Sequence, residues 1–135
     1  METIRIFDYH HARPTPWGKA DKVFELGLGF VLVGTPSHGG IMIGKKQAEE
    51  FLSQAAINRG QIFNQFLCYE EDSLEAIVLF EHPELWFKYR ATWTNEIRSI
   101  EKIKQAALKR LSRWNADYLL ERGIEPEPES EDGDI

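Results

Sequence analysis

Two short segments hold the residue types that acid–base and nucleophilic chemistry needs. The first, Thr35–Gly40, reads Thr-Pro-Ser-His-Gly-Gly and places two hydroxyls and an imidazole in one turn. Ser37 has the type of a nucleophile and His38 that of a general base, and paired glycines let the backbone approach a ligand closely. The candidate binding residues in this turn are Thr35, Gly39 and Gly40. The alternative is a hairpin turn whose hydroxyls bond neighbouring backbone groups.

The second segment, Tyr69–Asp72, contains three consecutive carboxylates. Glu70 is a candidate general base beside His38, and Glu71 and Asp72 are candidate binding residues. The alternative is a helix N-terminus, where acidic residues are favourable and Asp72 would be the cap. Because each segment borders an expected strand end, we expect the two to lie close together in the fold.

The net charge of −6 is localised in the tail. The 11 residues Glu125–Ile135 contain six acids and no base, and residues 1–124 contain 16 acids and 16 bases. Such a tail has little apolar surface to bury, which predicts disorder. It serves solubility, or it docks on a basic partner or competes with nucleic acid for that partner.

The neutral body contains two adjacent blocks of opposite charge. Glu70–Glu84 holds six acids and no base, including the candidate binding residue Glu84, whereas Lys88–Arg113 holds eight bases and two acids. The blocks are solvated helix faces that meet each other, or a bipolar surface for a charged partner. Aromatic residues near the start of the basic block are suited to stacking on bases, but a neutral body disfavours direct nucleic-acid binding.

Several classes of site are disfavoured by composition. The single cysteine, Cys68, excludes an intramolecular disulfide and fits a reducing compartment. The four histidines and Cys68 show no paired-ligand spacing, so we expect no metal and no cofactor. No apolar run approaches the ~20 residues of a membrane span, and no signal peptide is visible, so the sequence predicts a cytoplasmic protein.

The chain has 135 residues, which suits one domain, and its pattern predicts an α+β fold. Short runs at Val23–Leu26, Phe30–Val33 and Ile41–Ile43 predict a small antiparallel sheet of about three strands. Helices of the second half would pack on this sheet. We therefore predict a single domain over residues 1–124 and an acidic flexible tail over 125–135.

Three helices are expected from helix-forming composition and apolar spacing. Lys45–Ala56 is the first, and a second follows Asp72 and ends at His82. The third, Thr94–Arg122, has apolar residues at three- or four-residue intervals and would be about 40 Å long. A helix of this length exceeds what a small body needs, so homo-oligomer formation through it is one expectation.

The two chemical segments, together with Trp17–Asp21, resemble a small domain family of unknown function from bacterial phage and plasmid genomes. The shared motifs are a Trp-Gly-x-Ala-Asp start, the Thr-Pro-Ser-His-Gly-Gly turn and a Tyr-Glu-Glu-Asp segment before the apolar helix Ser73–Phe80. The resemblance covers roughly residues 17–80, and Ser73 stands where a cysteine is expected. It implies a mobile-element setting, in which accessory proteins often counter host defence, and it carries over no catalytic residue.

Two functions remain open at this level. The first is a phage or mobile-element accessory protein that binds a host-defence or nucleic-acid-binding protein, as an anti-CRISPR-like, anti-defence inhibitor does. The second is a small hydrolase or transferase that uses Ser37, His38 and Glu70 on a phosphate-bearing substrate. The sequence favours the first function and leaves the question of enzymatic activity undecided.

Overall fold

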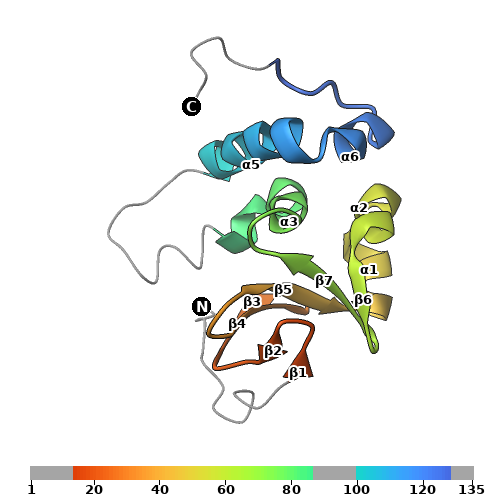
Figure 1. Ribbon diagram of the computed structural model, residues 1–135. Helices are drawn as coiled ribbons and strands as arrows, with labels where there is room; N and C mark the ends of the chain where they lie inside the picture. The colour runs from red at the N-terminus through yellow and green to blue at the C-terminus, as the bar shows by residue number, and fades with distance from the viewer. Residues whose placement is uncertain (1–13, 87–99, 129–135) are drawn as a thin grey trace.

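The β-branched and aromatic runs of the first half form three consecutive antiparallel strands, as the sequence predicts. They are β3 (Lys22–Gly27), β4 (Phe30–Gly34) and β5 (Gly39–Gly44). The computed structural model describes residues 14–86 and 100–128 (Figure 1). Residues 87–99, which include the first part of the basic block, lie outside the described residues.

A second hairpin makes the sheet larger than the three strands expected. β6 (Gln61–Phe63) and β7 (Phe66–Glu70) extend it to five antiparallel strands in the order β3-β4-β5-β7-β6. The turn between them has Asn64 at a φ of 55°, a left-handed conformation that asparagine tolerates better than most residues. The sheet therefore places the ends of β5 and β7 side by side.

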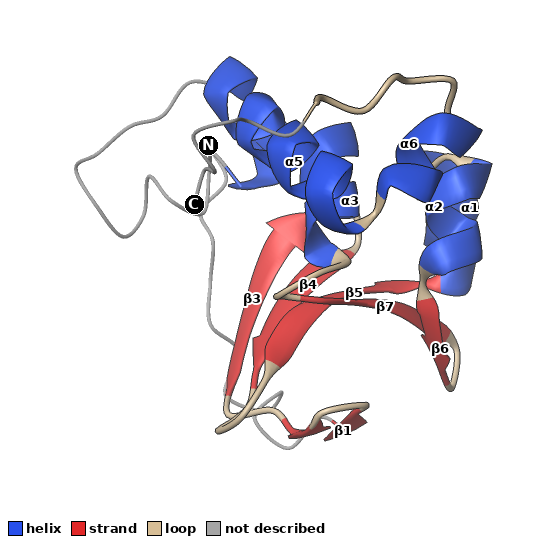
Figure 2. Ribbon diagram, turned by 45° about the horizontal axis from the view of Figure 1, so that its top comes forward, coloured by secondary structure: helices blue, strands red, loops and turns tan. Residues whose placement is uncertain are grey.

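Both faces of the sheet are apolar. Helices cover one face, and the short hairpin of β1 (Pro14–Thr15) and β2 (Gly18–Lys19) lies on the other side (Figure 2). Trp17, in the turn of this hairpin, packs against the second-face cluster. The buried residues of that cluster are Ala20, Val23, Val33, Met42 and Cys68.

Five described helices accompany the sheet, and α1 follows β5 directly. They are α1 (Lys45–Phe51), α2 (Gln54–Arg59), α3 (Glu75–Glu81), α5 (Ile100–Trp114) and α6 (Ala116–Glu121). Their apolar sides enclose the larger core together with the sheet residues that alternate with the second-face cluster, such as Ile41, Ile43 and Tyr69. This arrangement confirms the predicted α+β fold with an antiparallel sheet packed by helices.

Two of the expected helices are each divided into two shorter helices. The helix predicted over Lys45–Ala56 stops at Phe51, because Ser53 caps a new helix with its Oγ 3.1 Å from the Ala56 amide. The helix predicted over Thr94–Arg122 is divided at Asn115, whose φ of −140° and ψ of 47° are not helical. Its main described part, α5, is 15 residues or ~22 Å long.

One carboxylate joins three helices that are distant in sequence. Glu81, at the end of α3, has a side chain only 8% exposed. Its Oε2 accepts hydrogen bonds from Ser53 Oγ at 2.5 Å and Tyr118 OH at 2.5 Å, and it pairs with Arg122 Nη1 at 2.8 Å. The Glu81 junction (Ser53, Glu81, Tyr118 and Arg122) therefore holds α2, α3 and α6 together.

The C-terminal helix ends in a glycine cap, and the chain then turns back. Gly123 has a φ of 76°, and the Ile124 amide donates to the Leu119 carbonyl at 2.8 Å. Residues 125–128, the first four of the predicted tail, then lie against α5, where the Glu127 amide donates to Ser112 Oγ at 2.8 Å. The rest of the acidic tail lies outside the described residues.

Candidate functional site

The turn predicted to do chemistry is built around Thr35. Its Oγ1 donates to the His38 carbonyl at 2.7 Å and accepts from the His38 amide at 3.1 Å. The Thr35 amide donates to the same carbonyl at 2.7 Å. These bonds match the alternative interpretation, in which the threonine hydroxyl closes the hairpin turn.

Strand pairing brings this turn to the acidic segment. β5 pairs with β7 so that Gly40 is opposite Glu70, and the Glu71 amide donates to the Gly39 carbonyl at 2.9 Å. His38 Nδ1 then lies 3.4 Å from Glu70 Oε2. The expected proximity of the two segments is confirmed.

The His38–Glu70 pair resembles a base and its orienting carboxylate but lacks the third member. The side chains are 50% and 34% exposed, so water reaches both groups. Ser37 is exposed as well, and within the described residues no hydrogen bond joins it to His38. An activated serine needs that contact, although apo sites are often looser than working ones.

Close packing explains the two glycines. A Cβ at Gly39 would lie 2.6 Å from the Val33 carbonyl oxygen. A Cβ at Gly40 would lie 2.7 Å from a Trp17 ring carbon and would also collide with the Tyr69 carbonyl. The sheet itself therefore excludes side chains here, so the glycines need no ligand to account for them.

The acidic segment does not cap α3 in the predicted way. α3 begins at Glu75 after Leu74, and no side chain bonds its first amides, so the capping role assigned to Asp72 is wrong. Glu71 and Asp72 are exposed, and Arg110 Nη2 donates to the Glu71 carbonyl at 3.0 Å. The loop is thus tied to α5 while its carboxylates stay in solvent.

Glu75 is an unexpected buried acid beside this loop. Glu75 is 6% exposed, and burial raises the pKa of its carboxyl from 4.5 to about 7. Arg110 opposes that rise in pKa, whereas the charges of Glu71 and Asp72 add to it. The first turn of α3 therefore contains a carboxyl that titrates near neutral pH.

Trp114 is the last residue of α5. It continues the apolar spacing of the helix, yet it is 68% exposed. Arg113 stacks on its ring with Cζ 5.6 Å from the centroid. The next residue, Asn115, donates from its side-chain amide to the Ser73 carbonyl at 3.4 Å, which places the C-terminal end of α5 against the segment that follows the acidic loop.

The last candidate binding residue, Glu84, lies apart from the Thr35–Gly40 turn and the Glu70–Asp72 loop. Its Oε2 lies 3.1 Å from His82 Nδ1, beyond the C-terminal end of α3. Asp72 precedes the same helix, whose seven residues span ~10 Å. The acidic block Glu70–Glu84 is therefore divided between the two ends of α3.

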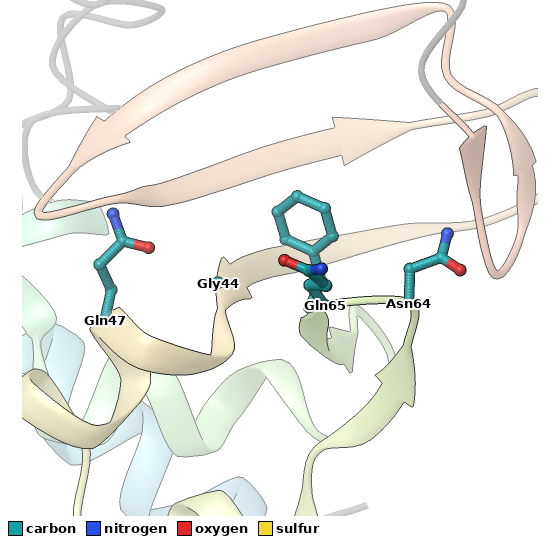
Figure 3. Close-up of a pocket in the computed structure, with 5 residues that line it drawn as sticks. Gly44, Gln47, Asn64 and Gln65 are labelled. Atoms are coloured by element: carbon teal, nitrogen blue, oxygen red, sulfur yellow. The ribbon is translucent and has the colours of Figure 1, made fainter.

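One open concavity of about 800 Å³ lies at the opposite end of β5 from His38. Figure 3 shows Gln47 from α1, Gly44 at the end of β5, and Asn64 and Gln65 from the β6–β7 turn around it. The lining is completed by Phe66 and contains amides, backbone and a phenyl ring. With no titratable group in its lining, the concavity is unsuited to acid–base chemistry.

The described part of the chain offers no group of three or more His, Cys, Asp or Glu residues that could hold a metal ion. Among those same residues, none of the helices combines the length and apolar character needed to cross a membrane. Burial raises the pKa of the Cys68 thiol to about 12, which makes it a poor nucleophile. The notable features are thus an exposed polar corner, formed by the Thr35–Gly40 turn and the Glu70–Asp72 loop, and the exposed indole of Trp114.

Fold and surface together define a small α+β protein with a five-stranded antiparallel sheet, helices on one face and an exposed polar corner. The chain belongs to the DUF7007 family, a domain of unknown function, whose model matches residues 10–130. Comparisons with curated proteins and with solved structures found no match.

Proposed function

We propose that this protein acts by binding another protein, through a surface formed by Trp114, Glu71 and Asp72. We call this the tryptophan–acid surface. The single observation that carries the proposal is an indole 68% exposed at the end of α5, the same end that Arg110 and Asn115 tie to the loop of exposed carboxylates. Tryptophan is enriched among the residues that dominate protein interfaces, since it buries a large area at little entropic cost.

The surface is held in place before a partner arrives. Arg110 ties the Glu71 backbone to α5, and Arg113 stacks on the indole. Groups already fixed in position lose less conformational entropy on binding. The surface therefore fits a partner with an apolar slot for the indole and cationic groups opposite Glu71 and Asp72.

A basic partner agrees with the functions expected from the sequence. Proteins that bind nucleic acids carry clustered Lys and Arg residues, which would face the two carboxylates. The motif resemblance supports a finer version of the proposal: a phage- or plasmid-borne accessory protein, in the host cytoplasm, that inhibits a host-defence protein. The charges would steer the encounter, and the indole would supply most of the affinity.

The second candidate is the hydrolase or transferase, and the His38–Glu70 distance of 3.4 Å favours it. If His38 is a general base, His38→Ala should abolish an activity on a phosphate-bearing substrate while leaving the unfolding free energy nearly unchanged. If the protein is only a binder, the same variant should bind its partner as the wild type does.

Affinity capture from bacterial cells that carry the gene, followed by binding measurements with the purified partner, tests the proposal. Trp114→Ala should weaken binding at least tenfold, which corresponds to ~1.4 kcal/mol. Leu120→Ala is the matched control, because Leu120 on α6 is 62% exposed and apolar but is not part of the surface. Its affinity should stay within about twofold of wild type.

Charge reversal separates the two parts of the surface. Glu71→Lys with Asp72→Lys should slow association, and the effect should fade as ionic strength rises above ~0.15 M. Wild-type affinity in Trp114→Ala, or an equal loss in Leu120→Ala, would show that the partner binds elsewhere.

A further inference from the structure

We propose that the acidic end of the tail, residues 129–135, binds the basic outer face of α5 within the same molecule. This contact would use the side of the helix that faces away from the core. Arg113, which stacks on the Trp114 indole, takes part in both proposals. The variants that test the tail contact leave Arg113, Trp114, Glu71 and Asp72 unchanged, so either proposal can fail without the other.

The described part of the tail already leads onto α5. The Glu127 amide donates to Ser112 Oγ at 2.8 Å, and Ser112 Oγ donates in turn to the Leu108 carbonyl at 2.8 Å. Pro126 and Glu127 are half-buried, and Ile124 packs against the larger core. Figure 1 shows this segment returning from α6 across α5. The tail therefore approaches residue 129 in contact with the helix.

The outer face of α5 has a basic stripe beside Ser112. At 100° per residue, Lys102, Lys109 and Arg113 fall within ~40° of one another around the helix, and all three are exposed. We call these three residues the basic stripe. Glu101 lies ~100° from Lys102 around the helix and accepts a hydrogen bond from Gln105 Nε2 at 3.1 Å. The stripe itself is thus positive.

The remaining tail is long enough and of the right charge to cover the stripe. Residues 128–135 can extend ~26 Å, whereas Lys102 lies ~15 Å from Ser112 along the axis of α5. This segment contains no base and four carboxylates, those of Glu129, Glu131, Asp132 and Asp134. A tethered segment has an effective concentration in the millimolar range, so weak ion pairs suffice to keep it bound.

A spin label placed near the end of the tail tests the contact in the full chain. Gly133→Cys provides the attachment point, because native Cys68 is fully buried and burial raises its thiol pKa to about 12. Amide NMR signals of Lys102 and Lys109 should broaden at low salt. The broadening should be lost at ~1 M salt, where the Debye length is ~3 Å.

Charge variants identify the groups responsible. Replacing the four tail acids by their amides should remove the broadening, and so should Lys102→Gln with Lys109→Gln. The matched control is Lys45→Gln with Lys46→Gln, which removes two exposed lysines from α1 and should leave the broadening unchanged.

Three results would overturn the proposal. The first is no broadening on α5 in the labelled wild-type chain. The second is broadening that persists after neutralisation of the tail. The third is broadening that grows with protein concentration and vanishes on dilution, which would assign the contact to the tail of a second copy.

Discussion

Replacing the buried acid Glu75 by glutamine should stabilise the protein in a pH-dependent way. Burial raises the pKa of this carboxyl from 4.5 to about 7, so the folded state holds the proton more tightly than the unfolded state. Stability is therefore lost as pH rises from about 4.5 to about 7, and the loss is constant at higher pH. The wild type thus carries an unfavourable buried charge in mildly alkaline solution.

The size of the effect follows from the two pKa values. A difference of about 2.5, at ~1.4 kcal/mol for each pKa unit, gives ~3 kcal/mol as an upper figure at pH 8.5. At pH 5 most of that penalty is absent, because the folded carboxyl is protonated. Glu75→Gln should therefore be more stable than wild type by ~2–3 kcal/mol at pH 8.5 and by less than ~1 kcal/mol at pH 5.

Urea unfolding at the two pH values measures this difference. With a slope of ~1–3 kcal/mol per molar urea, the midpoint of Glu75→Gln should move upward by ~1 M or more at pH 8.5. Glu49→Gln, which changes an exposed acid on α1, is the control and should stay within ~0.5 kcal/mol of wild type at both pH values. A stability difference for Glu75→Gln that is the same at pH 5 and pH 8.5 would refute the reasoning.

Two further predictions concern packing and the Glu81 junction. Gly40→Ala should lower the unfolding free energy by ~1–3 kcal/mol, since its Cβ would lie 2.7 Å from the Trp17 ring; a fully stable variant in urea unfolding would contradict this. Tyr118→Phe should cost ~1.5–3 kcal/mol, because it removes a hydroxyl that donates to the Glu81 carboxylate; thermal unfolding measures the loss, and an unchanged midpoint would show that the bond contributes nothing.

The strands could be predicted because their signal is local. Phe30–Val33 and Ile41–Ile43 are dense in β-branched and aromatic residues, and the intervening turn is rich in glycine, so pattern and structure agree. The closeness of His38 and Glu70 followed from two strand ends sharing one sheet edge. The sequence pattern could not show whether His38 and Glu70 form a functional site or only flank a structural turn.

The breaks in the helices could not be predicted because distant residues stabilise them. Ser53 interrupts a run of good helix formers, and its hydroxyl both caps α2 and bonds Glu81, 28 positions away. Trp114 continues the apolar spacing of α5 but lies in the last turn before Asn115 redirects the chain. Glu75 lies in the first turn of α3, where acidic residues are normally exposed, so its burial had no signal in the sequence.

The Glu81 junction also bears on how the protein opens. If one of these helices separated from Glu81, its nearly buried carboxylate would lose a hydrogen-bond or ion-pair partner. Leaving a buried charge without its partners costs free energy. Fraying of α6 alone is therefore penalised, although it is short and close to the chain end. Native-state hydrogen exchange should accordingly show the amides of α2, α3 and α6 opening as one cooperative unit.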